Sequence, residues 1–174
     1  MELDQPTEAL PAPVQGRDEI VIDALPEDVW PLIADSRLLP KWGPPVVSVE
    51  VAGPPDRPEG VGSRRRVDAK FGRRIGYYVE RRIQHVPERR MAFLIEEETF
   101  GLFRFLERVG ALMEIEPAGP NQTRVTWSFF HQSRGLLGAV MNRAVILRQQ
   151  RANRLRALAS LKAFAEEGRV RPVP

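Results

Sequence analysis

The sequence predicts an α+β fold in which one antiparallel sheet of about seven strands packs against a long C-terminal helix. Apolar and polar residues alternate along most of 46–131, and only short turns interrupt the alternation. Strands joined by short turns are antiparallel, because parallel strands need long crossover connections. A helical pattern then extends over 136–166. A chain of 174 residues with 43% hydrophobic residues is long enough for one core, so we expect a single domain over 18–167.

Before the main run of strands, the sequence predicts one strand and two short helices. The segment 19–24 alternates like a strand. Pro26 opens the segment 26–36, where a proline suits the first helical turn and the two acids after it suit the helix dipole. Residues 37–42 form a second short helix, which Gly43 and the two prolines after it end.

Six further strands and one long helix complete the expected fold. Turns rich in glycine and proline separate the strands. The strands are expected at residues 46–52, 61–71, 75–84, 90–98, 103–116 and 123–131. Gly135 lies just before the helix over 136–166, and Gly168 lies just past its end. At about 1.5 Å per residue this helix would be on the order of 45 Å long, so we expect a bend or a shorter ordered portion.

The ends of the chain and its composition exclude several classes of protein. Residues 1–17 and 168–174 lack a periodic apolar pattern, and we expect flexible tails there. The sequence has neither a signal peptide nor an apolar stretch long enough to span a membrane, so we expect a cytoplasmic protein. Zero cysteines and two histidines argue against disulfides, thiolate nucleophiles and zinc sites built on sulfur or on three histidines. We therefore expect no metal and no cofactor.

Two sequence segments resemble a known superfamily. Residues 24–35 (ALPEDVWPLIAD) with 37–42 (RLLPKW), and residues 79–93 (VERRIQHVPERRMAF), are similar to structural motifs of the SRPBCC superfamily. This superfamily includes START-type lipid carriers, birch-pollen-allergen-like proteins and polyketide cyclases. The resemblance covers roughly 19–166, and it implies a helix-grip fold in which a curved sheet and the C-terminal helix enclose a hydrophobic cavity. These motifs build structure, so no catalytic residue is transferred from them.

The alternation also predicts which side chains face the inside of the sheet. Large aromatic side chains in the inward phase would line a ligand cavity or fill it as core. The inward aromatic residues are expected to be Tyr77, Phe93, Phe105, Trp127 and Phe129. Ala111 is expected on the same inner face and Ala144 on the inner side of the helix.

Several polar residues fall in the same inward phase. They are Arg65, Arg81, Glu97, Glu107 and His131. If a three-residue turn pairs Phe71 with Ile75, then Arg65 lies opposite Arg81, and the later turns place Glu107 beside His131. Buried charges are costly unless they are paired. These residues therefore either form an internal ion-pair network or face a ligand.

The C-terminal helix adds one more candidate. At 100° per residue, Arg151 falls in the middle of the apolar side of the helix. A buried guanidinium needs a partner, so we expect Arg151 to reach the rim of the cavity, to pair with Glu107 or Glu97, or to face an anionic group of a ligand.

Three functions fit these features. The leading hypothesis is binding or transport of a small hydrophobic ligand, such as a lipid, an isoprenoid, an aromatic or a polyketide-like molecule, held by the inward aromatic residues and by Arg65, Arg81 and Arg151. The second is a cyclase or dehydratase that uses Glu107 and His131 as general acid and base. The third is an RNA- or ribosome-associated interaction protein that uses the basic C-terminal helix. The phosphate-loop, nucleophile-elbow and HExxH motifs are absent, and the dinucleotide fingerprint is incomplete.

The distribution of charge bears on the partners. No acidic residue occurs from Pro117 to Ala165, whereas this segment carries many arginines. Such a basic surface either pairs with acids elsewhere in the fold or contacts an anionic partner, and it leaves peripheral membrane contact open. Nucleic acid is disfavoured, because the sheet arginines alternate with acids and no aromatic stacking platform accompanies them. The oligomeric state stays open.

Overall fold

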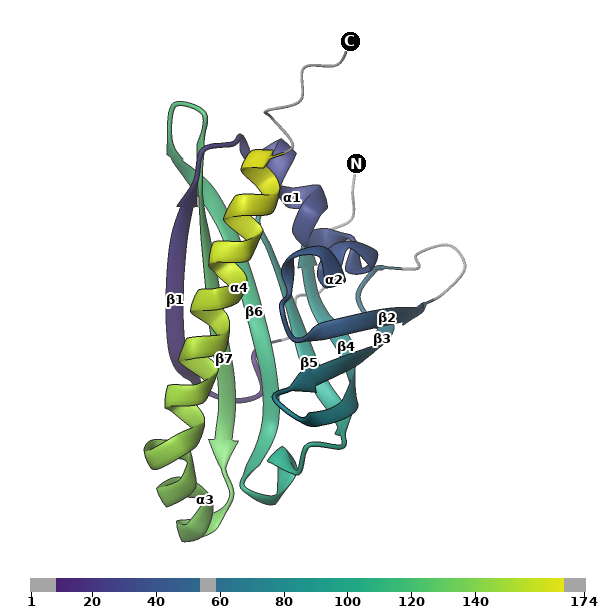
Figure 1. The fold of residues 1–174 in the computed structure, drawn as a ribbon, viewed down its shortest axis with the longest axis vertical. Coiled ribbons are helices and arrows are strands. Elements are labelled where there is room, and N and C mark those ends of the chain that lie inside the picture. Colours follow the sequence, from purple (N-terminus) through teal and green to yellow (C-terminus); the bar gives the residue numbers. More distant parts are fainter. Residues whose placement is uncertain (1–8, 54–58, 168–174) are drawn as a thin grey trace.

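The computed structural model describes residues 9–53 and 59–167. Its seven strands form one antiparallel sheet in the order β1-β7-β6-β5-β4-β3-β2 (Figure 1). The strands are β1 (Val14–Ile22), β2 (Val46–Ala52), β3 (Arg64–Phe71), β4 (Arg74–Val86), β5 (Arg90–Glu98), β6 (Leu106–Gly119) and β7 (Gln122–Ser133). The expected antiparallel sheet of about seven strands is therefore confirmed.

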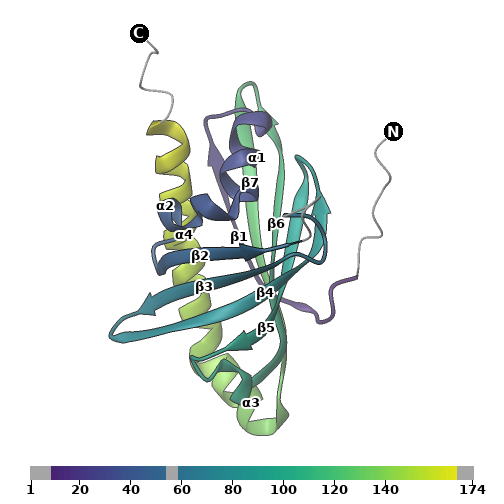
Figure 2. The ribbon, with the colours of Figure 1, turned by 90° about the vertical axis from the view of Figure 1, so that its right-hand side faces the viewer.

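The α-helices follow the first strand and the last strand of the sheet. After β1 come α1 (Pro26–Ala34), the 3-10 turn η1 (Ser36–Leu38) and α2 (Leu39–Trp42), and the 3-10 turn η2 (Leu102–Arg104) precedes β6. The C-terminal helix consists of α3 (Gly135–Met141), a π-helical turn η3 (Asn142–Ile146) and α4 (Leu147–Glu167). It spans the length of the sheet, with α1 and α2 close to its C-terminal end (Figures 1 and 2). This arrangement is the expected helix-grip fold.

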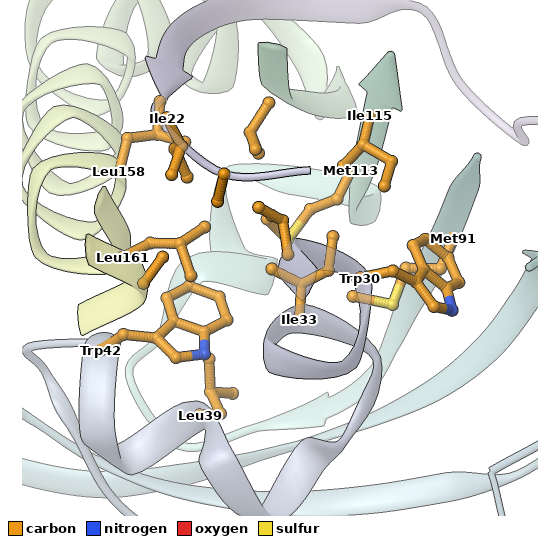
Figure 3. Packing of buried hydrophobic residues seen from close by; sticks show 14 of the residues in the cluster. Ile22, Trp30, Ile33, Leu39, Trp42, Met91, Met113, Ile115, Leu158 and Leu161 are labelled. Carbon is orange, nitrogen blue, oxygen red and sulfur yellow. The ribbon is translucent and has the colours of Figure 1, made fainter. Parts of the chain in front are cut away.

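The main hydrophobic core joins α1 and α2 to the inner face of the sheet and to α4. Ile22 of β1, Ile33 of α1, Trp42 of α2 and Leu158 of α4 are all buried in it (Figure 3). The Trp42 indole Nε1 donates to the Leu32 carbonyl at 2.9 Å, which satisfies its polar atom inside this core. This core fills one end of the space between sheet and helix.

A second cluster covers the outer face of the sheet. Ile83, Leu112 and Phe130 are buried there, and Leu10 and Ala12 pack against them. β1 begins at Val14, whereas the alternation predicts a strand from residue 19. Part of the segment expected as an N-terminal tail is thus in the sheet. Residues 1–8 of that tail and the expected tail at 168–174 lie outside the described residues.

Local irregularities change which side chains face inward. Gly72 and Arg73 form a two-residue turn that pairs Phe71 with Arg74, instead of the expected three-residue turn that would pair it with Ile75. The pairing also shifts by one residue at Glu96 in β5, and between Glu107 and Gly110 in β6, where Arg108 has a φ of 53°. Each extra residue reverses the inward and outward phase of the strand beyond it.

Candidate functional site

A cavity of about 460 Å³ lies between the sheet and the C-terminal helix. Its walls are mostly apolar and aromatic, and they come from β2 to β7, from α1, α2 and η2, and from the C-terminal helix. The aromatic wall residues include Phe71, Tyr78, Phe93, Phe105, Trp127 and Phe129. Trp127 also packs edge-on against Trp42 at a centroid distance of 6.0 Å, which joins the cavity wall to the main core. A volume of this size is in the range of small-molecule pockets.

The exposed members of the lining mark the mouth of the cavity. Arg74 at the start of β4, Val145 in η3 and Gln149 in α4 line the cavity and are exposed to solvent. Phe100 and Gly101, which connect β5 to η2, also belong to this lining. The mouth therefore lies between the β3–β4 turn, the β5–β6 connection and the beginning of α4.

Five of the residues predicted to line a cavity do lie on its wall. They are Arg65, Phe93, Phe105, Trp127 and Phe129. Their strands keep the expected phase at these positions, because the irregularities in β5 and β6 lie outside the stretches that carry Phe93 and Ala111. Phe105 reaches the cavity from the end of η2, although the alternation predicts a strand there.

Tyr77 and Arg81 do not line the cavity, and here the predicted strand phase is wrong. The Tyr77 hydroxyl contacts Glu97 Oε1 at 2.5 Å, and Arg81 Nε donates to Glu96 Oε1 at 2.8 Å, both on the outer face of the sheet. The two-residue turn at the start of β4 shifts this strand by one position. Tyr78 and Glu80 consequently take the inward places that the alternation assigned to their neighbours.

Glu107 and His131 are not brought together, and neither lines the cavity. Glu107 is paired in register with Gln132, and its carboxylate lies 3.7 Å from Arg134 with a partly exposed side chain. The pairing shift at Arg108 places Glu107 on the side of β6 opposite to Val109. The expectation that Glu107 and His131 form an acid–base pair in the cavity is therefore wrong.

The His131 side chain is fully buried beneath the helix. Its Nε2 lies 2.9 Å from Asn142 Oδ1, while Asn142 Nδ2 donates to Ser133 Oγ. This orientation of the amide requires His131 Nε2 to carry the proton. Burial, together with the charge of Arg154, lowers the pKa of His131 below its ordinary value, although the bond to Asn142 opposes the shift. His131 is thus a neutral core residue.

Arg151 is exposed and bonds Asp18 at 3.3 Å, so its expected inward position is also wrong. Arg154 is buried and lines the cavity, and its Nη2 lies 2.7 Å from Asp18 Oδ2. The apolar side that places Arg151 inward is defined partly by Leu137, Val140 and Ala144, which are exposed in the structure, so it is not the side of the helix that packs on the sheet. The buried side of α4 carries Arg154, Ala157 and Leu158 instead.

A buried ion pair on the cavity wall is the main polar feature that the alternation missed. Arg65 and Glu80 are 2.5 Å apart, with side-chain exposures of 9% and 7%. Arg65 Nη1 also donates to Ser36 Oγ at 2.9 Å, and the guanidinium stacks 3.7 Å from the centre of the Phe93 ring. Recognising Gly72 as part of a two-residue hairpin turn would have predicted Glu80 opposite Arg65.

Behind this pair lies a second buried arginine. Arg82 is 1% exposed, binds Glu59 at 2.6 Å and donates to the Ala34 carbonyl at 3.1 Å. Burial and the neighbouring charge of Arg65 lower the pKa of Arg82 to about 10, against the opposing effect of Glu59. Arg82 stays protonated at neutral pH, and the cluster ties β4 to α1 and to the segment before β3.

Tyr78 places a hydroxyl on the cavity wall. Burial raises the pKa of Tyr78 well above its ordinary value, and the charge of Glu80 adds to this effect. The hydroxyl makes no hydrogen bond to any residue in the described part of the chain. It is therefore a protonated group that is free to donate to, or accept from, a molecule in the cavity.

The structure provides no metal centre within residues 9–53 and 59–167. No group of three or more histidine, cysteine, aspartate or glutamate side chains there could hold a metal ion. No helix among these residues is long and apolar enough to cross a membrane.

Comparisons with known proteins agree with this geometry. A family model described as polyketide cyclase/dehydrase and lipid transport matches residues 13–166. A START superfamily protein from Mycobacterium smegmatis matches with a TM-score of 0.69 at 12% identity, covering 89% of this chain and 99% of that one. An aromatase/cyclase from Streptomyces sp. R1128 matches with a TM-score of 0.68 at 20% identity, covering 90% and 94%.

A protein from Thermus thermophilus is also similar, with a TM-score of 0.68, 23% identity, and coverage of 87% of this chain and 97% of that chain. A comparison with curated proteins found no significant match. At these identities the solved structures establish the fold alone.

Proposed function

The chain belongs to the polyketide cyclase/dehydrase and lipid transport family, and from this membership we propose that it binds a small hydrophobic ligand in the cavity between sheet and helix. The family covers both carriers and enzymes. The observation that carries the proposal is a cavity of about 460 Å³ whose walls are mainly aromatic and aliphatic. Such walls favour a lipid, an isoprenoid, an aromatic or a polyketide-like molecule.

The polar groups of the wall narrow the kind of ligand. Arg65 and Glu80 neutralise each other, and Arg154 is neutralised by Asp18. A ligand with a full charge would have to displace one of these pairs, which is costly for buried ions. The Tyr78 hydroxyl has no protein partner within the described residues, so we infer a neutral ligand that carries at least one oxygen able to hydrogen-bond with it.

Binding without chemistry fits the cavity better than catalysis. A cyclase or dehydratase needs a general acid and a general base within hydrogen-bond reach of the ligand. Glu107 and His131 lie outside the cavity lining. Of the two carboxylates that line the cavity, Glu80 is held by Arg65, and Glu98 accepts hydrogen bonds from the backbone N–H groups of Phe100 and Phe103. Tyr78 alone could supply a proton donor. The RNA-binding alternative finds less support, because sheet arginines such as Arg64 and Arg81 are paired with Glu96.

The proposal can be tested by filling the cavity. Ala111 lines the cavity, whereas Ala144 is exposed on the other side of the helix, so the same substitution at the two positions forms a matched pair. We expect Ala111→Phe to weaken binding of the neutral fluorescent probe N-phenyl-1-naphthylamine by roughly tenfold or more, and Ala144→Phe to leave it unchanged. Because the new ring enters open space, stability should change by less than the roughly 1–3 kcal/mol that overpacking of a filled core costs.

Two results would contradict the proposal. One is equal probe binding by the wild type and Ala111→Phe, and the other is loss of stability in Ala111→Phe without any probe binding by the wild type. Native mass spectrometry of the protein purified from its own host supplies the identity of the ligand, since a copurified neutral molecule would appear as a defined mass increment.

A further inference from the structure

The short helix α3 exposes an apolar face at the end of the molecule where the cavity opens. Leu136, Leu137 and Val140 have exposures of 89%, 68% and 63%. Gly138 is buried on the opposite side of α3, where a Cβ atom would lie only 2.3 Å from the Phe105 carbonyl oxygen. The close contact at Gly138 therefore fixes which way α3 is turned, and it directs the three aliphatic side chains away from the protein.

Arginines without protein partners in the described residues surround this face. Arg143 and Arg148 follow it along the helix, and Arg104 lies in η2, beside the start of α3. All three are exposed and make no ion pair or hydrogen bond through their side chains within the described part of the chain. No acidic residue occurs from Pro117 to Ala165. The helical part of this surface is thus both apolar and positively charged.

The same surface adjoins the mouth of the cavity. Val145 is exposed, belongs to η3 immediately after α3, and also lines the cavity. Arg74 and Gln149 complete the exposed rim. A partner bound to the α3 face would therefore lie next to the opening through which a ligand passes.

We propose that this docking surface, formed by Leu136, Leu137, Val140, Arg104, Arg143 and Arg148, binds the surface of an anionic phospholipid bilayer. Aliphatic side chains can enter the boundary between headgroups and acyl chains, while arginines bind the phosphates beside them. RNA would match the arginines, but it gives three clustered aliphatic side chains nothing to bury against, and no exposed aromatic ring accompanies them for stacking among the described residues. The bilayer is the partner that uses both halves of the surface.

The docking goes beyond the binding of a ligand and does not depend on it. It would place the cavity mouth at a phase in which hydrophobic molecules dissolve. If the cavity proves to hold nothing, the surface can still bind vesicles, and a failure of vesicle binding leaves the cavity experiment unaffected.

The experiment is cosedimentation of the full chain with sucrose-loaded vesicles. Vesicles of phosphatidylcholine alone are compared with vesicles that contain about 30% phosphatidylglycerol, a composition chosen for the assay, in about 0.1 M salt. We expect binding to the anionic vesicles and little binding to the neutral ones. The variant Arg143→Gln/Arg148→Gln should bind about 25-fold more weakly, since each arginine near an anionic surface contributes about a factor of five.

The apolar half of the surface is tested by Leu136→Ser/Leu137→Ser/Val140→Ser. We expect this variant to bind the anionic vesicles at least roughly tenfold more weakly, because it loses the apolar area that enters the bilayer. Val47→Ser, which changes a 62% exposed residue on β2, and Arg89→Gln, which changes an exposed arginine at the β4–β5 turn, are the matched controls and should bind like the wild type. Circular dichroism melts verify that every variant is folded.

Three outcomes would overturn the proposal. In the first, the folded wild type stays in the supernatant with anionic vesicles. In the second, the serine variant binds as well as the wild type while the glutamine variant does not, which indicates a purely ionic surface suited to RNA. In the third, light scattering shows a dimer that the serine variant dissociates, which assigns the apolar face to a second copy of the chain.

Discussion

The two buried arginines on the inner face, Arg65 and Arg82, both face the ring of Phe93, at 3.7 and 5.0 Å from its centre. Two like charges so close together are tolerable only because each has its own carboxylate, Glu80 for Arg65 and Glu59 for Arg82. The aromatic ring between them adds a further attraction for both guanidinium groups. The charges of Arg65 and Arg82 on the inner face are therefore balanced.

Replacing Glu80 should lower the stability of the protein, because it removes the carboxylate that neutralises Arg65. In Glu80→Gln, Arg65 remains buried without a countercharge, and we expect the free energy of unfolding to fall by about 3–5 kcal/mol. Urea denaturation measures the loss. Glu116→Gln is the control, because the Glu116–Arg124 pair is exposed and should contribute no more than about 1 kcal/mol. A loss in Glu80→Gln no larger than that of the control would show that Arg65 finds another partner.

His131 predicts a dependence of stability on pH. Burial lowers its pKa in the folded protein, whereas in the unfolded chain it titrates at its ordinary value near 6.5. As the pH falls below about 6.5, His131 becomes protonated in the unfolded chain but stays neutral in the folded protein. The free energy of unfolding therefore decreases toward pH 5, by at most about 1.4 kcal/mol per pH unit. Denaturation of the wild type and His131→Gln between about pH 7.5 and 5 measures this, and the variant should show the smaller slope. Equal slopes would contradict the assignment.

Single residues show where prediction from sequence stops. Phe93, Trp127 and Phe129 lie on the cavity wall because the alternation of their strands is regular at these positions. Tyr77 and Tyr78 are adjacent and have the same side chain. The hydrophobic pattern is therefore the same whether the turn before them has two residues or three. Only the pairing of Phe71 with Arg74 decides which of the two tyrosines faces inward.

At the scale of elements, the sequence predicts the seven strands, the two short helices after β1 and the C-terminal helix, but not η2 or the irregularities within the elements. The pairing shifts in β5 and β6 and the π turn η3 each insert one residue into an otherwise regular pattern. Arg108 has a positive φ, but arginine is not a residue type from which a left-handed conformation can be predicted. The misplacement of Glu107 follows directly from the insertion in β6. Arg151 is misplaced because apolar residues that define its side of the helix, such as Leu137 and Val140, are exposed in the structure.

The packing of α3 gives a prediction for an element. Gly138→Ala would put a methyl group 2.3 Å from the Phe105 carbonyl oxygen, which is backbone and cannot turn aside. We expect a loss of about 1–3 kcal/mol in stability, together with local displacement of α3. Ala139→Ser, an exposed change on the same helix, should cost no more than about 0.5 kcal/mol.

Thermal unfolding compares the two variants, and hydrogen exchange of 135–141 locates the displacement. Unchanged exchange and stability in Gly138→Ala would show that α3 is held only loosely against η2. The docking surface of α3 would then lack the fixed orientation that Gly138 provides.

For the whole molecule, the sequence predicts more than it does for any single site. Successive short turns require an antiparallel sheet, and an unbroken helical pattern after the last strand requires a covering helix. Neither argument depends on the phase of a strand, which is why the helix-grip fold is correct although Tyr77, Arg81, Glu107 and Arg151 are misplaced. The cavity itself arises from the spacing between sheet and helix, and no single residue encodes that spacing.

The position of β1 has a consequence for how the chain folds. β1 does not pair with β2, which follows it, but with β7, so that Ile20 lies opposite Val125, and Asp18 reaches Arg154, 136 residues later. Contacts between such distant parts of a chain slow folding, because a large loop must close before they form, and sheets of this kind typically fold in about milliseconds to seconds. During synthesis on a ribosome, β1 therefore has no strand partner until β7 has emerged. The inner wall of the sheet is covered only after the C-terminal helix, which follows β7, has also been made.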